Sequence, residues 1–145
     1  MQAQMLAPAA VLVLWSMIML LWMVFTRFPA IAKSGIDLSQ SKPGARGQSL
    51  DGVLPDKVMW KSHNYTHLME QPTIFYPAVV ILAVVGADAV DVALAWTYVA
   101  LRIVHSLWQA MVNRLPVRIA LFSLSSLVLV ALAIRAVSVT VFAAP

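Results

Sequence analysis

The stretch Asn64 to Pro77, NYTHLMEQPTIFYP, decides how the rest of this chain is arranged. It opens a long apolar segment, yet it holds one acidic residue, Glu70, just inside that segment. A carboxylate inside a membrane helix costs roughly 2.5 to 3.5 kcal/mol unless it faces a partner or a wet cavity. We therefore expect Glu70 to pair with a residue from another part of the chain.

The composition places the chain among membrane proteins. Hydrophobic residues make up 61% and charged residues 11% of the 145 residues, and the mean hydropathy is +0.84. Soluble domains carry about 25% charged residues, so this chain is too apolar to be one. Cysteine is absent, which excludes disulfides, thiolate metal sites and a cysteine nucleophile. The net charge of +4 comes from basic residues scattered over loops, so it reports membrane topology and not nucleic-acid binding.

Several apolar segments are long enough to cross a hydrocarbon core of about 30 Å. The sequence predicts an all-α, integral membrane four-helix bundle that forms a single domain over residues 1–145. We expect helices at about 5–28, 56–85, 91–112 and 118–142, and a cytoplasmic loop at about 29–55. Pro72 and Pro77 predict a kink in the second helix, which neighbouring helices can tolerate by binding the freed carbonyls.

Lysine and arginine gather in only some of the connections. The first loop and the entry to the second helix hold Arg27, Lys33, Lys42, Arg46, Lys57 and Lys61. The last turn holds Arg114 and Arg118, whereas the N-terminal segment and the turn at 86–91 hold none. The positive-inside rule puts both basic connections in the cytoplasm and both termini on the outer side. We expect a multi-pass membrane protein, in the inner (plasma) membrane if the source is bacterial, with Arg135 snorkelling to the outer interface.

Polar residues form a stripe on each of the two middle helices. The stripe on the second helix holds His63, His67 and Glu70, and the stripe on the third holds Arg102, His105, Ser106 and Gln109. Helical spacing places the members of each stripe on one face, so the two stripes are expected to face each other or a shared cavity. Arg102 is the strongest candidate partner for Glu70, because its long side chain reaches back toward the cytoplasm. Glu70→Gln is then expected to destabilise the assembly by leaving Arg102 without its counter-charge.

Two chemistries fit such a pocket, besides a purely structural pair between helices. Arginines can bind an anionic soluble cosubstrate from the cytoplasm, beside an apolar groove for a lipophilic substrate, and can stabilise a thiolate. The other chemistry is a metal site, with His63, His67, Glu70 and His105 as its ligands. The metal interpretation is weaker, because Arg102 would repel a cation and there is no second cluster of histidine and carboxylate.

Three motifs together carry a family resemblance. They are HLMEQPTIFYPAV on the second helix, LRIVHS on the third and LPVR at the start of the fourth. With them the chain resembles the MAPEG family, the membrane-associated proteins of eicosanoid and glutathione metabolism, over about residues 64–135. The resemblance implies a homotrimer in membrane lipid, with glutathione as a cosubstrate bound between subunits near the cytoplasmic side.

The resemblance also implies roles for individual residues. It makes Arg118 the catalytic arginine that activates the glutathione thiolate. It makes the cosubstrate-binding residues Arg27, His67, Glu70, Arg102, His105 and Gln109. The family's typical second helix has an arginine and an asparagine where this chain has Thr66 and His67, and glutathione-using members often carry a tyrosine at the place of Gln109.

The expected function is that of a glutathione-dependent transferase or peroxidase acting on lipophilic electrophiles at the membrane. The alternative is a non-catalytic MAPEG-like protein that binds lipid or a partner, which the substitutions at Thr66, His67 and Gln109 favour. A metal-dependent membrane enzyme comes third.

Overall fold

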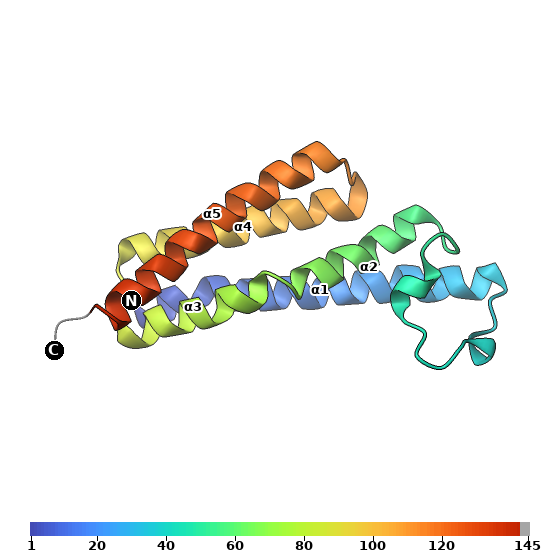
Figure 1. The fold of residues 1–145 in the computed structure, drawn as a ribbon, viewed down its shortest axis with the longest axis horizontal. Helices are drawn as coiled ribbons and strands as arrows, with labels where there is room; N and C mark the ends of the chain where they lie inside the picture. The colour runs from blue at the N-terminus through green and yellow to red at the C-terminus, as the bar shows by residue number, and fades with distance from the viewer. Residues whose placement is uncertain (143–145) are drawn as a thin grey trace.

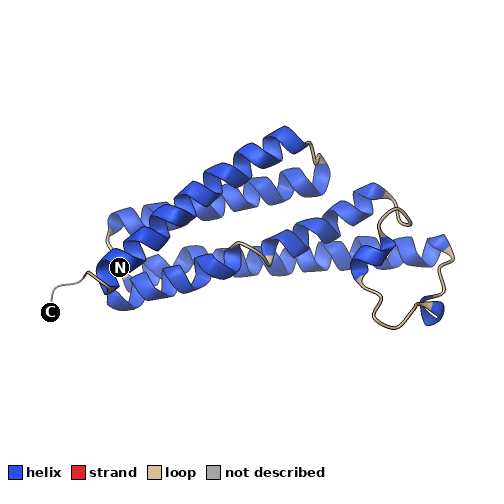
Figure 2. Ribbon diagram, in the orientation of Figure 1, coloured by secondary structure: helices blue, strands red, loops and turns tan. Residues whose placement is uncertain are grey.

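The computed structural model describes residues 1–142, which form a bundle of long helices and contain no β-strand (Figures 1 and 2). The long helices are α1 (Gln2–Ser34), α2 (Asp56–Leu68), α3 (Pro72–Val85), α4 (Ala89–Met111) and α5 (Leu115–Thr140). Two short 3₁₀ helices, η1 (Leu38–Gln40) and η2 (Gly47–Leu50), lie in the loop after α1. The predicted all-α class is confirmed.

The bundle is that of a multi-pass membrane protein. Four helical segments are long and apolar enough to span a bilayer, and the second of them is made of α2 and α3 together. An even number of spans returns the chain to the side from which it started, and Figure 1 shows both ends of the chain at the same end of the bundle. At that end the α4–α5 hairpin lies close to α1 and α3, and toward the other end the hairpin leans away from α1 and α2.

The second span is broken at residues 69–71, immediately before Pro72. Proline lacks the N–H that would continue the helix, so the backbone tightens before it. The amides of Met69 and Glu70 bond the carbonyls of Thr66 and His67, three residues back, at 3.0 and 3.3 Å. The kink predicted from the prolines is therefore a complete break, and Pro77 is accommodated inside α3.

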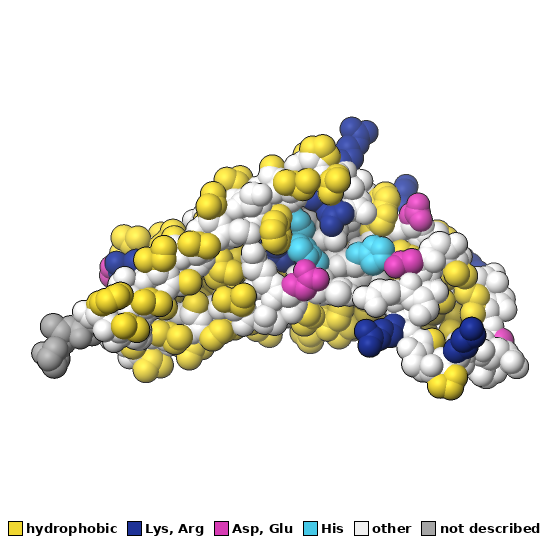
Figure 3. All heavy atoms as spheres, in the orientation of Figure 1, with side chains coloured by type: hydrophobic (Ala, Val, Ile, Leu, Met, Phe, Trp, Pro, Cys, Tyr) yellow, Lys and Arg dark blue, Asp and Glu magenta, His cyan; other side chains and the backbone are white. Residues whose placement is uncertain are grey.

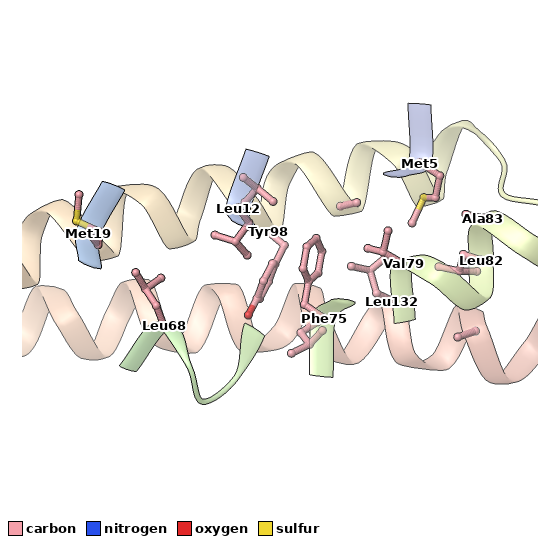
Figure 4. Close-up of a cluster of buried hydrophobic side chains, with 14 residues drawn as sticks. Met5, Leu12, Met19, Leu68, Phe75, Val79, Leu82, Ala83, Tyr98 and Leu132 are labelled. Carbon is pink, nitrogen blue, oxygen red and sulfur yellow. The ribbon is translucent and has the colours of Figure 1, made fainter. Parts of the chain in front are cut away.

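The apolar core occupies the half of the bundle that holds the termini. Its centre is the Phe75 ring of α3 stacked on the Tyr98 ring of α4, with centroids 4.5 Å apart (Figure 4). Leu12 of α1 and Leu132 of α5 are fully buried in the same cluster. Lipid tails are as apolar as these side chains, so close van der Waals packing and not water exclusion holds the spans together.

Arg135 lies against two acidic residues at the α3–α4 turn, which is the connection predicted to face the outer side. Its position at the outer interface stays a prediction. Its Nε donates to Asp91 Oδ1 at 2.7 Å, and its Nη2 also bonds Asp88. The Asp91 side chain is fully buried, and Asp88 caps the start of α4 by accepting from the amides of Val90 and Asp91. Bonding from the Asp91 amide first, and then from Val90 and Arg135, lowers the pKa of Asp88. These three charged residues form a clamp that joins α4 to α5.

Candidate functional site

A pocket of about 150 Å³ opens where the α4–α5 hairpin leans away from α2. Its lining residues are His67 of α2, His105 of α4, and Leu115, Arg118, Ile119 and Phe122 of α5. Figure 3 shows histidine, acidic and basic side chains gathered in this hollow, on a surface that is otherwise mostly hydrophobic along the bundle. Three predicted site residues from three helices, His67, His105 and Arg118, therefore meet in one pocket.

His67 is the residue around which the pocket is built. Its ring lies 5.0 Å from the His105 ring and 5.6 Å from the Phe122 ring, measured between centroids. Its Nδ1 lies 2.8 Å from Glu70 Oε2, and its backbone carbonyl accepts a bond of 3.2 Å from Arg102 Nη2. The ring is thus held by groups from α4, from α5 and from the break between α2 and α3.

The predicted pairing of Glu70 with Arg102 is wrong in this structure. Glu70 bonds His67, and 61% of its side chain is exposed. The break before Pro72 changes the direction in which Glu70 points, so its carboxylate lies at the rim of the pocket and not inside a continuous membrane helix. The high cost assigned to a carboxylate inside the membrane does not apply to a group this exposed.

Arg102 is fully buried behind the pocket. Among the described residues its only hydrogen-bond partner is the His67 carbonyl, and its Nε and Nη1 have none. Buried polar groups are nearly always hydrogen-bonded in native proteins, and a buried charge without a counter-charge is strongly destabilising. An anionic ligand would supply these two nitrogens with hydrogen-bond acceptors and Arg102 with a counter-charge.

Arg118 enters the pocket from the first turn of α5. Its Nη1 donates to Asn113 Oδ1 at 2.9 Å, and its buried Nε has no partner among residues 1–142. Asn113 adopts a left-handed conformation, with a φ of 57°, in the turn between α4 and α5. That turn fixes the guanidinium at the positive end of the α5 dipole, which favours negative charge.

Two predicted site residues neither line the pocket nor bond a residue that lines it. Arg27 bonds the Gly47 carbonyl at 2.5 Å and Ser62 Oγ at 3.1 Å. Gln109 is buried one turn beyond His105, and its Oε1 has no partner in the described part of the chain. The structure therefore brings together five of the predicted residues: His67, His105 and Arg118 in the pocket, with Glu70 and Arg102 adjoining it.

Asn64 is a candidate binding residue that was not predicted from the sequence. Its side chain is buried, with 1% of the residue exposed, and neither amide atom has a hydrogen-bond partner among the described residues. Asn64 precedes His67 by three residues, which places both on one face of α2. That spacing was the available signal, and it identifies Asn64 as a further candidate binding residue.

The four candidate metal ligands do not converge. His63 Nε2 lies 2.8 Å from Asp51 Oδ1, so this histidine is paired with the loop and not with His67. Within residues 1–142 no group of three or more histidine or acidic side chains is placed to hold a metal ion.

Comparison with known proteins agrees with this architecture. The sequence profile of the MAPEG family matches residues 5–138, a stretch that includes most of all four spans. No curated protein and no solved structure matches the chain. On the family match, this chain belongs to the MAPEG family, the membrane proteins of glutathione and eicosanoid metabolism.

Proposed function

We propose that the protein is a glutathione-dependent transferase or peroxidase that acts on lipophilic electrophiles. The observation that carries the proposal is the meeting of Arg118 with His67 and His105, directly in front of the buried and under-bonded Arg102. This pocket accumulates positive charge at one end of a membrane bundle. Phe122, which is 38% exposed, forms its lipid-facing edge and offers contact to an apolar substrate.

Glutathione suits the charges of this site. The tripeptide carries two carboxylates and one ammonium group, so two arginines and the start of α5 attract it electrostatically. The exposed carboxylate of Glu70 can accept the ammonium group. The unpartnered Nε and Nη1 of Arg102 can bind a carboxylate in a forked geometry.

Arg118 is the proposed catalytic residue. A guanidinium beside the cysteine sulfur of glutathione favours the thiolate, which is the nucleophile. In the transferase reaction the thiolate attacks an electrophilic carbon; the new carbon–sulfur bond forms while the leaving group departs with its electron pair, and the thiol proton goes to solvent. In the peroxidase reaction two glutathione molecules supply two electrons, giving a glutathione disulfide, an alcohol and water from one hydroperoxide.

The proposal includes a homotrimer. Large apolar side chains are exposed along α1, among them Leu14, Leu21 and Phe25, which are 53 to 72% exposed. Lipid can cover such a surface, and so can neighbouring subunits. Subunit packing beside the pocket would also bring new partners to Asn64 and Arg102, whose buried polar atoms lack them within one chain. Native mass spectrometry of the detergent-solubilised protein measures the number of subunits directly.

The test of the enzyme is a comparison of two arginines in one turn. Arg118→Ala should reduce kcat with chlorodinitrobenzene by about a factor of 10² to 10³, as expected when a donor to a developing anion is removed. Arg114→Ala is the matched control, because Arg114 lies in the same turn but does not line the pocket. Equal activity of both variants would contradict the catalytic role, and the absence of glutathione binding at millimolar concentration in calorimetry would overturn the whole proposal.

The second candidate is a non-catalytic MAPEG protein. The observation that favours it is the bond between His67 and Glu70, which occupies a carboxylate that the cosubstrate would need. In this case the purified wild type is folded and oligomeric but binds no glutathione. His67→Asn, which removes the partner of Glu70, would separate the two candidates if it created glutathione binding where the wild type shows none.

A further inference from the structure

A second and larger cavity, of about 890 Å³, lies between the end of α1 and the loop that follows it. Its walls come from residues 23–31 of α1 and residues 38–50 of the loop. It shares no lining residue with the pocket of His67, His105 and Arg118. The proposed glutathione chemistry therefore does not account for it, except that Arg27 lies on its wall.

The cavity lining combines apolar and basic side chains. The α1 wall is apolar except for Arg27, and the loop adds two basic residues, Lys42 and Arg46, among small and apolar ones. None of the lining residues is acidic. The two acidic residues that flank this part of the loop are bound elsewhere: Asp37 accepts from Ser39, and Asp51 from His63.

The basic side chains of the cavity lie where the apolar part of α1 ends, which marks the edge of the membrane. No charged side chain precedes Arg27, so α1 is apolar up to the level of Met23 and Val24. The loop at 38–50 lies beyond that level, at the end of the bundle away from the termini (Figure 1). One side of the cavity is therefore at the depth of acyl chains, and the other is at the depth of lipid phosphates.

We propose that this cavity binds an anionic phospholipid from the adjacent leaflet. The upper part of an acyl chain lies against Met23 and Val24, and the phosphate is bound by Lys42 and Arg46. A basic side chain near an anionic membrane surface contributes a few-fold to binding, and here two are held over one apolar wall. Apolar contact and charge together select a molecule that has both a chain and a negative headgroup.

The loop is held in place over the cavity by a specific contact. Arg27 donates from Nη2 to the Gly47 carbonyl at 2.5 Å and from Nη1 to Ser62 Oγ at 3.1 Å. A Cβ atom at position 47 would lie 2.7 Å from both terminal nitrogens of Arg27, which is too close. Glycine at 47 is thus what allows α1 to hold the loop, so the cavity exists before a lipid binds.

Native mass spectrometry of the full chain tests the proposal, with phosphatidylglycerol and phosphatidylcholine of identical acyl chains as probes. Each basic side chain removed should weaken phosphatidylglycerol binding about fivefold, so phosphatidylglycerol should bind the wild type about 25-fold more tightly than phosphatidylcholine. The Lys42→Gln, Arg46→Gln double variant should therefore lose the preference. Its control is the double variant Lys33→Gln, Lys57→Gln, which removes the same charge from residues outside the cavity and should retain the preference.

Three results would overturn the proposal. The first is equal binding of the two lipids by the wild type, and the second is an equal loss in both double variants, which would indicate only general surface charge. The third is equally tight binding of glycerol phosphate, which has the headgroup charge but no chain. Ala45→Trp provides a separate test, because Ala45 is an exposed lining residue and a bulky side chain there should exclude the lipid. Glutathione binding should persist in the Lys42 and Arg46 variant, so this test is independent of the proposed enzyme.

Discussion

Glu70 and Arg102 show how a charge can be predicted inside a membrane bundle and yet be placed differently. Both belong to polar stripes read from helical spacing, but the break before Pro72 gives Glu70 an exposed position and a bond to His67. Arg102 remains buried and bonds the His67 carbonyl. The two charges are therefore connected through His67 and not to each other.

This arrangement changes the expected outcome for Glu70→Gln. The sequence alone predicts destabilisation, but an exposed pair such as Glu70 with His67 contributes only about 0 to 1 kcal/mol. We expect a small change in the melting temperature in detergent and a clear loss of glutathione affinity. Arg102→Met serves as the comparison, because a buried charge replaced by an apolar side chain of similar size can leave stability unchanged or raise it. A large fall in melting temperature for Glu70→Gln would show that the carboxylate has a buried partner after all.

At the scale of elements, the break between α2 and α3 and the clamp between α4 and α5 position the two halves of the bundle. Pro72 begins α3, and in the tightened turn before it the His67 carbonyl accepts from both the Glu70 amide and Arg102. The α4–α5 turn sets Arg118, and Asp88, Asp91 and Arg135 tie the other ends of these two helices together. Each contact depends on where one helix ends and the next begins.

Pro72→Ala should join α2 and α3 into a more continuous helix. Alanine restores an N–H that can bond the Leu68 carbonyl and favours helix, so hydrogen exchange at residues 69–74 should slow. Glutathione binding should weaken, because a continuous helix changes the position of Glu70 beside the pocket. Pro77→Ala is the control, since Pro77 lies inside α3 without breaking it. Unchanged exchange in Pro72→Ala would mean that packing, and not proline, sets the break. The measurement is hydrogen exchange followed by mass spectrometry.

The clamp predicts a dependence of stability on pH. The pKa of Asp88 is below its ordinary value of 3.8, so its stabilising contribution is complete above that value. It is lost as the pH falls through the lowered pKa of the folded protein. The melting temperature of Asp88→Asn, measured in detergent at a series of acidic pH values, should therefore fall less steeply with decreasing pH than that of the wild type.

Arg135→Met should lower the melting temperature at neutral pH by more than Asp88→Asn does, because it leaves the buried Asp91 carboxylate without its counter-charge. Equal effects of the two substitutions would show that Asp91 does not depend on Arg135.

At the scale of the whole molecule, the four spans place the start of α1 and the end of α5 on one side. The pocket of His67 and the cavity beside the loop at 38–50 lie toward the other side. The charge pattern predicts that this other side is the cytoplasm. The chain lacks cysteine, so single cysteines report topology without background. Ala3→Cys should react with an impermeant maleimide on intact cells, and Ser41→Cys only after permeabilisation. The reverse pattern would invert the orientation and contradict a cytoplasmic source of glutathione.

The number of spans, the membrane class and the family were all readable from the sequence. They depend on the lengths of apolar segments and on short motifs such as LRIVHS, which are local properties of the chain. The meeting of His67 with His105 was predictable as well, because helical spacing places each of them in a polar stripe. The addition of Arg118 to this site came from the family resemblance.

Only the tertiary structure decided which charges touch. Glu70 lies in the break between α2 and α3 and bonds His67. Arg135 bonds two acidic residues that lie 44 and 47 positions earlier in the chain, and Arg27 bonds the carbonyl of a glycine in the loop. The direction of a long side chain depends on helix rotation and on helix ends, which differ by a residue or two from any estimate based on hydropathy. A shift of one residue turns a side chain by about 100° around a helix, enough to exchange a buried partner for an exposed one.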